Sequence, residues 1–336
     1  GDKISARALA KKSKVPMADG SEGLANIDEV LAEVKKAGLP VIFKAAAGGG
    51  GRGMRIVREE SELKTAFDMA SNEAQAAFGD PRLFVESYIE NARHVEVQIM
   101  GDDFGHVVHI GMRDCSPQRR HQKVIEEAPP YHLPEALGNR IMESAVALTS
   151  SIGYSGAGTA EFLVDKDRDA FYFMEVNTRI QVEHPVSEEI SGIDLIKEQI
   201  RVGFGAPLSF TQADVEFNGA AIECRITAED PKDDFFPSPG VIDKFVAPTG
   251  DKVRVDTHCY SGYEVSPYYD SMIAKLITTG ANREEAIANM KSALADLVIE
   301  GIDTNIPFLE FVIDQPEFIA GDIDIKWIEN SVLPKF

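Results

Sequence analysis

The chain has 336 residues, of which 44% are hydrophobic and 26% are charged, a balance that predicts a globular protein with a real core, in one large or two to three ordinary domains. A formal net charge of -21 disfavours nonspecific binding to nucleic acid or to an anionic membrane, so an anionic ligand would need a local cluster of cations. Cys115, Cys224 and Cys259 lie far apart and form no CxxC motif, which argues against a disulfide framework and a zinc site.

The first segment, GDKISARALAKKSKVP, has the apolar spacing of a helix. Residues 1–15 are predicted to form a connecting helix, because Ile4, Ala8 and Leu9 recur at helical intervals. The chain opens without Met and on this connecting element rather than on a first strand. We therefore expect further residues to precede it in the complete protein.

Residues 16–89 are predicted to form a small α+β unit. Residues 27–38 fit an amphipathic helix that stops at a glycine, and PVIFKAA fits a buried strand. The strand MRIV, the helix ESELKTAFDMASNEAQAAF and the strand RLFVESYI follow. A glycine-rich loop at the edge of such a unit is a candidate lid that closes over a ligand.

That loop lies in KAAAGGGGRGMRIV, where residues 48–53 include five glycines. Glycine loses the most conformational freedom on folding, so the run suggests an offsetting use, such as close approach of a ligand. Successive free N–H groups bind phosphates well. A flexible hairpin tip would give the same pattern, but the nearby cations Lys44, Arg52 and Arg55 favour phosphate. The spacing fits neither a P-loop nor a dinucleotide fingerprint.

Residues 90–336 are predicted to form a larger, mainly antiparallel unit. Alternation over residues 93–113 predicts a hairpin around GDDFG, and GTAEFLV and AFYFMEVN flank the turn DKDRD as a second hairpin. Further strands are expected in AAIECRI, GVIDKFV, KVRVD and MIAKLIT. Helices are expected over 135–151, about 191–203 and 283–299, the last with a capping box at Asn282 and Glu285.

Two acidic residues should face each other across the second hairpin. Glu161 and Glu175 are placed symmetrically about residue 168 to within one residue, so their Cβ atoms should lie roughly 5 Å apart on one face. Facing carboxylates repel unless they reach water or share a cation or proton. The neighbours are largely apolar, which favours a cation, and carboxylate oxygens suit Mg²⁺ or Mn²⁺. A solvated hairpin face remains an alternative.

Polar residues then occupy every second position beyond that hairpin. If the segment stays extended, they share one strand face. An ordinary surface strand would also alternate, but this mixture of acids, amides and a cation favours the wall of a site. The residues are Glu175, Asn177, Arg179, Gln181 and Glu183.

A third cluster gathers cations in an otherwise acidic chain. Salt bridges to nearby acids such as Glu126 and Glu127 would explain it, and an anion site is the sharper alternative. Arg225, among apolar neighbours, also needs a partner, either structural or a ligand. The cluster consists of Arg113, Arg119, Arg120, His121 and Lys123.

Together, eight motifs resemble the biotin carboxylase component of biotin-dependent carboxylases, which is an ATP-grasp enzyme. They run in the family's order from the GDK at residue 1 to about residue 330. The resemblance implies an α+β ATP-grasp fold, with a glycine-loop lid subdomain (16–89) and a larger, mainly antiparallel C-terminal domain (90–336). The motifs are KAAAGGGGRGM, RHVEVQ, RDCSPQRRHQKVIEEAP, AGTAEF, FMEVNTRIQVEHP, ECRITAEDP, FPSPG and YYDSMIAKL.

The resemblance also implies roles for individual residues. Glu183 matches the general base, Arg225 the arginine that steadies the biotin enolate, and Glu86 the group that reads the adenine amino edge. The metal positions are Glu161, Glu175 and Asn177. The bicarbonate pocket comprises Arg179, Gln181 and the Val182 backbone. Contacts to ATP or its phosphates are implied for Lys3, Lys44, Gly48, Gly49, Gly50, Gly51, Gly53, His94, Gln118, His121 and the catalytic Lys123.

The implied activity is a ligase reaction, the ATP- and bicarbonate-dependent carboxylation of biotin through carboxyphosphate. It is the first half-reaction of an acyl-CoA or pyruvate carboxylase, and the final acceptor is chosen elsewhere. ATP, Mg²⁺ or Mn²⁺, bicarbonate and biotin are the expected ligands. Expected partners are a biotin carboxyl carrier protein or domain, a carboxyltransferase and a second copy in a homodimer, with no nucleic acid and no membrane. We expect a cytoplasmic or organelle-matrix location, since no apolar run reaches transmembrane length.

Several departures from the family pattern qualify this prediction. Met112 stands where relatives usually carry an acid, and Ala46 replaces a small hydroxyl residue. The family's α/β domain ahead of GDK is not in this sequence, so activity could be impaired. Lys291 lacks the Met-Lys-Met signature of a biotinylated lysine, so biotin must arrive on another chain or segment. The alternatives are an ATP-binding fragment with little activity, another carboxylate-activating ATP-grasp ligase, or a nucleotide-binding module without catalysis.

Overall fold

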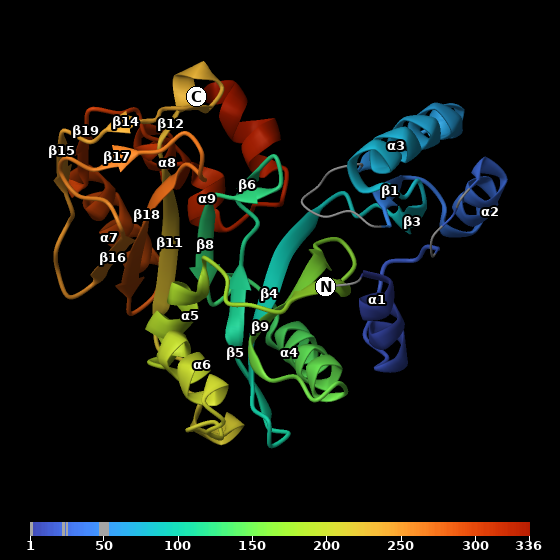
Figure 1. Ribbon diagram of the computed structural model, residues 1–336, viewed down its shortest axis with the longest axis horizontal. Coiled ribbons are helices and arrows are strands. Elements are labelled where there is room, and N and C mark those ends of the chain that lie inside the picture. The colour runs from blue at the N-terminus through green and yellow to red at the C-terminus, as the bar shows by residue number, and fades with distance from the viewer. Residues whose placement is uncertain (1–2, 22–23, 25, 47–53) are drawn as a thin grey trace.

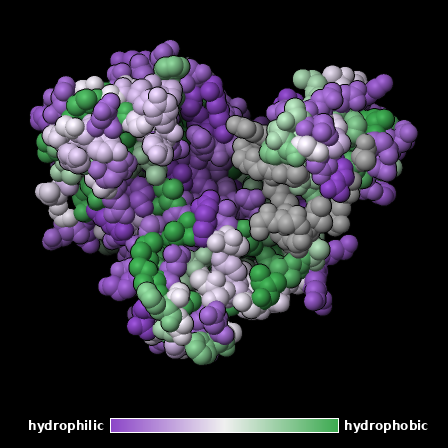
Figure 2. Space-filling model, viewed as in Figure 1, coloured by the Kyte–Doolittle hydropathy of each residue, from purple (hydrophilic) through white to green (hydrophobic). Residues whose placement is uncertain are grey.

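The computed structural model describes the chain except residues 1–2, 22–23, 25 and 47–53, and except the side chains of residues 3–6. The chain forms two lobes, each built on its own antiparallel sheet (Figure 1), and they flank an open notch on the surface (Figure 2). The helix α1 (Lys3–Lys12) packs on the larger lobe, where Ala10 belongs to the apolar cluster that includes Phe162 and Phe171. No helix within the described ranges is both long and apolar enough to cross a membrane.

The smaller lobe is a three-stranded sheet covered by two helices. Its strand order is β2-β1-β3, and Phe43, Leu63, Phe67 and Val85 lie in its buried core. Asn26 starts the first helix by accepting a hydrogen bond from the Glu29 N–H. The elements are α2 (Ile27–Ala37), β1 (Val41–Ala45), β2 (Arg55–Val57), α3 (Leu63–Phe78) and β3 (Leu83–Ser87).

The larger lobe is organised by an eight-stranded antiparallel sheet with the order β10-β9-β4-β5-β8-β11-β18-β16. Its strands are β4 (Ala92–Gly101), β5 (Val107–Asp114), β8 (Ile125–Ala128), β9 (Gly156–Asp165), β10 (Ala170–Asn177), β11 (Ala220–Thr227), β16 (Val253–Thr257) and β18 (Met272–Gly280). The long helices that pack on it are α4 (Glu135–Ser150) and α7 (Arg283–Asp296).

Side-chain alternation along these strands builds a layer on each side of the sheet. Ile222 and Cys224 of β11 belong to the large apolar cluster that includes Met290 of α7. Ala221 of the same strand instead packs with Val186 of α5 (His184–Ser191). Since alternate residues of a strand face opposite sides, residues 221, 223 and 225 point towards α5.

Short elements complete both lobes. The remaining helices are α6 (Leu195–Gly203), α8 (Ile306–Ile313), α9 (Pro316–Ala320), the 3-10 turns Glu60–Glu62, Gln212–Asp214, Pro231–Asp233 and Leu333–Lys335, and a π turn at Ile328–Val332. The short strands are β6 (Gln118–Arg119), β7 (Gln122–Lys123), β12 (Glu229–Asp230), β13 (Phe236–Pro237), β14 (Gly240–Val241), β15 (Lys244–Val246), β17 (Glu264–Val265) and β19 (Val298–Glu300).

The hairpin β9–β10 confirms the predicted facing pair, because Glu161 and Glu175 are register partners. A bulge between Phe173 and Glu175 shifts the register by one residue, so that Glu161 pairs with Glu175 and not with Met174. The hairpin around GDDFG is also as predicted. Asn282 caps α7 by accepting from the Glu285 N–H, but the Glu285 side chain accepts from the Ala281 N–H and not from the Asn282 N–H, so the predicted capping box forms only in part.

Four sequence predictions were wrong in detail. The extended segment ends at Asn177 rather than reaching residue 183, and α5 follows because Pro185 starts a helix easily. The expected helix over 191–203 is two helices, since Gly192 (φ 70°) ends α5 and Asp194 caps α6. The segment 240–246 holds two short strands, and the helix expected to reach residue 299 ends at Asp296 before β19.

Candidate active site

A cavity of about 920 Å³ lies between the two lobes, and polar residues gather in the notch that leads to it (Figure 2). Every predicted site residue whose side chain is described lines this cavity: Lys44, Glu86, His94, Gln118, His121, Lys123, Glu161, Glu175, Asn177, Arg179, Gln181, Val182, Glu183 and Arg225. The predicted glycines Gly48, Gly49, Gly50, Gly51 and Gly53 and the side chain of Lys3 lie outside the described residues.

Lys123, at the end of β7, is the centre of a buried ion-pair network. Its ammonium nitrogen lies 2.6 Å from Glu96 Oε2 and 3.3 Å from Glu161 Oε1, and it donates a short hydrogen bond to Glu183. Only 11% of its side chain is exposed. Burial would lower the pKa of Lys123, but Glu96 and the other nearby anions raise it well above its usual range. The cation is therefore fixed among three carboxylates.

Glu96 of β4 was not predicted as a site residue, although it joins this network. Its carboxylate is fully buried and also accepts from Arg113 Nε at 2.6 Å. Burial would raise the pKa of Glu96, but Lys123 and Arg113 lower it to about 2. In the sequence, Glu96 is one polar residue in an alternating strand, which is no signal for a buried charge.

Glu161 and Glu175 supply oxygen donors of the kind that hard divalent ions prefer. Glu161 Oε1 accepts from Asn177 Nδ2 at 2.8 Å and from Gln181 Nε2 at 2.9 Å, and Oε2 lies 3.4 Å from His94 Nε2. Burial would raise the pKa of Glu161, but His94, Lys123 and Gln181 hold it well below its usual range. The half-buried carboxylate of Glu175 has no hydrogen-bond or ion-pair partner among the described residues. The donor set fits Mg²⁺ or Mn²⁺.

Glu183 and Arg225 form the second half of the network. Glu183 stands at the N-terminus of α5 and is only 1% exposed. Arg225 NH2 lies 2.9 Å from Glu183 Oε2, while Arg225 Nε donates to Glu126 Oε1 at 2.6 Å. Burial would lower the pKa of Arg225, but Glu126 and Glu183 raise it. The Arg225 guanidinium therefore connects the buried Glu126 to Glu183, which lines the cavity.

The polar stripe reaches the cavity without sharing one strand face. Beyond Asn177 the chain turns, so Arg179 is exposed, whereas Gln181 is buried. The Val182 carbonyl accepts from Lys275 Nζ at 3.0 Å, and the Gln181 carbonyl accepts from the His184 N–H. These contacts fold the segment into the first turn of α5.

The cavity wall formed by the smaller lobe has fewer charged contacts. Glu86 of β3 accepts from Lys44 Nζ at 2.6 Å and forms a short hydrogen bond with Arg7 of α1. Opposite, on the larger lobe, Gln118 Nε2 lies 2.8 Å from His94 Nδ1. Arg7 was not predicted, and its position among helical residues carries no sign of a site.

The cationic cluster is only partly a cavity feature. Arg113 is fully buried against Glu96, which corrects its assignment to an anion site. Arg119 and Arg120 lie 3.0 and 2.8 Å from Asp234, so salt bridges explain them, although Glu126 and Glu127 are not the partners. Arg119 and Arg120 still line the cavity, together with Lys123 and with His121, whose φ is 64°.

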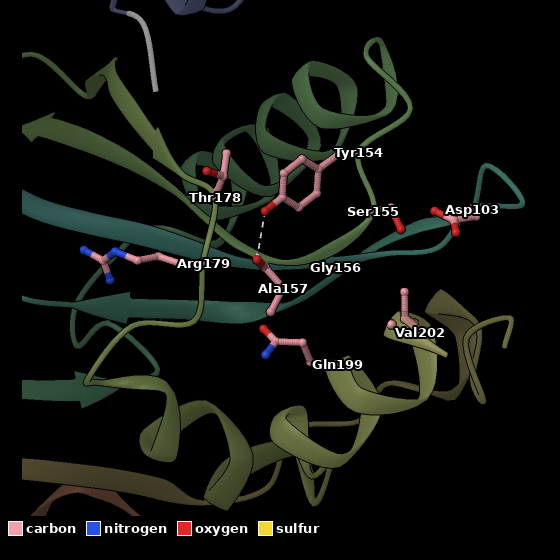
Figure 3. Close-up of a pocket in the computed structure, with 10 residues that line it drawn as sticks. Asp103, Tyr154, Ser155, Gly156, Ala157, Thr178, Arg179, Gln199 and Val202 are labelled. Carbon is pink, nitrogen blue, oxygen red and sulfur yellow. Dashed lines mark hydrogen bonds between the residues drawn. The ribbon is translucent and has the colours of Figure 1, made fainter. Parts of the chain in front are cut away.

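A second, open hollow of about 270 Å³ lies beside the first. Its lining includes Tyr154, whose hydroxyl donates to the Ala157 carbonyl at 2.8 Å. Figure 3 shows the Arg179 side chain extending away from Tyr154 and Ser155. The exposed guanidinium is therefore directed away from this hollow.

Comparison with known proteins defines the class. Residues 2–211 match the family described as "Carbamoyl-phosphate synthase L chain, ATP binding domain", and residues 223–330 match "Biotin carboxylase C-terminal domain". The chain therefore belongs to the biotin carboxylase family and has its ATP-grasp fold.

Particular relatives agree along almost the whole chain. Biotin carboxylase 1 of Bacillus subtilis is 49% identical over 331 residues, which cover 98% of this chain and 74% of that protein. The crystal structure of a biotin carboxylase–βγ-ATP complex from Campylobacter jejuni superposes with a TM-score of 0.94 at 50% identity, covering 98% and 73% of the two chains. The biotin carboxylase domain dimer of Hydrogenobacter thermophilus 2-oxoglutarate carboxylase, in complex with MgADP, ADP and bicarbonate, gives 0.93 at 45%, covering 98% and 73%.

Proposed function

We propose that this chain carboxylates biotin with ATP and bicarbonate, as the first half-reaction of a biotin-dependent carboxylase. The observation that carries the proposal is the cavity network, in which Lys123 joins Glu161 to Glu183 and Arg225 contacts Glu183. Glu175 faces Glu161 across the hairpin beside this network. Relatives named for biotin carboxylation, at 49% identity, support the same reaction. Another ATP-grasp ligase is disfavoured, because the second family match is to biotin carboxylase itself.

The residues of the larger lobe are proposed to prepare bicarbonate for attack. Bicarbonate is a poor nucleophile, so Glu183 would remove its proton while Arg179 and Gln181 hold it in line with the γ-phosphoryl group. Attack forms carboxyphosphate and releases ADP. Lys123, with Lys3 and Lys44, would neutralise charge that develops on the transferred phosphoryl group.

The second stage is proposed to occur beside Arg225. Carboxyphosphate breaks down to CO₂ and phosphate, and the phosphate takes the ureido proton of biotin. The resulting enolate would be stabilised by the Arg225 guanidinium while it attacks CO₂. Arg225 suits this role because its NH2 lies on the cavity side, beside Glu183.

The remaining cavity residues are proposed to bind nucleotide and metal. Glu161, Glu175 and Asn177 would hold Mg²⁺ or Mn²⁺, which when bound offsets the negative charge of the phosphates. Glu86 would read the adenine amino edge. The phosphate contacts would come from His94, Gln118, His121 and the glycines of residues 48–53.

We further propose three units with distinct tasks: a connecting helix (1–15), a nucleotide lid (16–89) and the catalytic domain (90–336). The partners would be a biotin carboxyl carrier, a carboxyltransferase and a second copy of the chain. The H. thermophilus relative described as a dimer supports the second copy, and a Methanothermobacter thermautotrophicus relative named for pyruvate carboxylase supports the other partners. The cytoplasm or an organelle matrix is the proposed location, in line with a relative named as chloroplastic.

The direct test measures ADP release with and without bicarbonate and free biotin. Hydrolysis of ATP that rises when both are added is the expected result, together with formation of carboxybiotin from labelled bicarbonate. A rate of ATP hydrolysis that does not change when bicarbonate and biotin are added would contradict the proposed reaction. Nucleotide binding should be measured on the same sample, since intact binding without turnover would identify a nucleotide-binding module instead.

A further inference from the structure

Two glutamates lie behind Arg225 in positions that the proposed chemistry does not use. Glu126 of β8 and Glu223 of β11 are register partners, and both are fully buried. Partners on antiparallel strands share a sheet face with Cβ atoms about 5 Å apart. Both therefore point into the layer between the sheet and α5, close to the helix end that carries Glu183.

The hydrogen bonds around this pair are incomplete. Glu126 Oε1 accepts from Arg225, but Glu126 Oε2 and both oxygens of Glu223 have no partner among the described residues. Buried polar atoms in native proteins are almost always hydrogen-bonded. A proton on Glu223 would satisfy Glu126 Oε2 and one oxygen of Glu223 together.

The neighbouring charges do not neutralise Glu223. Arg225, two residues along the strand, is engaged by Glu126 and Glu183. Lys275 of β18 donates to the Val182 carbonyl and lies 3.4 Å from Asp256. The third cation near the pair is Lys123, which forms ion pairs with Glu96, Glu161 and Glu183. Within the described part of the chain, no cation lies at ion-pair distance from Glu223.

The direction of titration agrees with this geometry. Burial, reinforced by Glu126, raises the pKa of Glu223 well above its ordinary value, although Lys275 and Arg225 oppose the shift. Burial also raises the pKa of Glu126, to about 7, against the attraction of Arg225 and despite Lys123, with Glu183 adding to the rise. Glu223 is thus the member of the pair that keeps its proton.

We propose that Glu223 is a neutral carboxylic acid that donates a hydrogen bond to Glu126, so that Glu126 acts as the anchor that positions Arg225. The donated bond stabilises Glu126 as a carboxylate. The carboxylate contacts Arg225 through both Nε and NH2, and NH2 also donates to Glu183 Oε2, which lines the cavity. Without the donor, Glu126 would take up the proton and release Arg225. The inference rests on the proposed role of Arg225 in biotin carboxylation.

Infrared spectroscopy tests the protonation state without any assay of activity. The wild-type protein at neutral pH should show the C=O stretching band of a protonated, dry carboxylic acid, and Glu223→Gln should lose it. A band that persists in Glu223→Gln but disappears in Glu126→Gln would place the proton on Glu126 and overturn the assignment. Absence of the band from the wild-type protein would overturn it as well.

Kinetics tests the positioning role with two matched variants. Glu223→Gln keeps a donor of the same shape and should retain the biotin-dependent rate, whereas Glu223→Met removes the donor. Glu223→Met should lower the biotin-dependent rate about 10-fold, the worth of one charge-assisted hydrogen bond, with KM for ATP unchanged. Equal losses in both variants, or a parallel change in KM for ATP, would indicate a merely structural role and overturn the proposal.

A double-mutant comparison links the two glutamates. Glu126→Gln should reproduce the defect of Glu223→Met, and combining the two changes should add little, because both remove the same anchor. Additive losses would contradict the shared role. If the wild-type chain shows no biotin-dependent turnover, the proposed function fails, whereas the infrared comparison still decides the state of Glu223, including when Glu223→Met does not fold.

Discussion

The two walls of the cavity hold their charges in different ways. On the larger lobe, Lys123 meets three carboxylates and Arg225 meets two, and nearly all of these groups are buried. On the smaller lobe, Lys44 pairs with Glu86 and is 24% exposed. Removing one member of a buried ion-pair network strongly destabilises the folded protein, whereas a more exposed ion pair contributes little to stability. Substitutions in the ion-pair network of the larger wall should therefore affect both turnover and folding, and those on the smaller wall should affect mainly nucleotide affinity.

The largest effect is expected for Glu183→Gln on the larger wall. Loss of the proposed base should lower bicarbonate-dependent turnover by about 10²–10⁴-fold, because general bases contribute that much. Steady-state ADP release measures it. Glu264→Gln, at an exposed position of β17, is the matched control and should keep full activity. A Glu183→Gln variant with undiminished turnover would remove Glu183 from the mechanism.

Lys123→Met tests how much the buried network of the larger wall contributes to folding stability, compared with the smaller wall. The change leaves Glu96, Glu161 and Glu183 without their common cation, at a cost of about 3–5 kcal/mol in the free energy of unfolding. Urea unfolding measures this, with Lys64→Met on the exposed face of α3 as control. A loss below about 1 kcal/mol would mean that the buried wall behaves like a surface pair.

Lowering the pH should destabilise the protein by protonating Glu96 in the larger wall. Its pKa of about 2 in the folded protein lies below the ordinary 4.5, so the stability it contributes is present above about pH 4.5 and is lost as pH falls towards 2. The loss amounts to about 3 kcal/mol. Unfolding free energies measured across this range should fall less steeply in Glu96→Gln. An unchanged slope would show that Glu96 is not held by Lys123 and Arg113.

Glu175→Gln should affect metal use more than folding, since its carboxylate has no partner in the described structure. The Mg²⁺ concentration needed for half-maximal ATP hydrolysis should rise on the order of 10-fold or more, because a ligand oxygen is lost. Thermal unfolding of the metal-free protein should stay unchanged. A Mg²⁺ requirement equal to that of the wild type would exclude Glu175 from the metal site.

The smallest effect is expected on the smaller wall. Lys44→Met should raise KM for ATP by up to about 10-fold, since one charge-assisted contact is lost, and should change stability by less than about 1 kcal/mol. Titration of turnover with ATP and urea unfolding measure the two quantities. A loss of stability as large as that of Lys123→Met would erase the distinction between the walls.

Local pattern was enough for much of the fold and for many cavity residues. The turn DKDRD brings Glu161 and Glu175 to within one residue of each other across the hairpin, because an antiparallel hairpin restricts the register of its strands. The bulge between Phe173 and Glu175 then makes them register partners. The resemblance motifs brought Glu183 and Arg225 into one site before any coordinates. Alternation failed between Asn177 and Glu183, where the chain leaves β9 after the pair Asn177–Thr159 and turns into α5.

Other members of the network could not be recognised from local pattern. Glu96 and Glu126 sit in strands buried on both faces, where an acid in the sequence looks like an ordinary outward residue. Their meaning depends on partners far along the chain, such as Lys123 for Glu96 and Arg225 for Glu126.

By itself, the sequence determined the family, the alternation of helices and strands and the hairpin that faces two acids, because these depend on residues near one another in the chain. Tertiary structure alone decided which charges are buried together. Strands β8 and β11 are neighbours in the sheet although about a hundred residues separate Glu126 from Arg225. Only that pairing, by excluding water, makes one glutamate an anchor and its partner a candidate neutral acid.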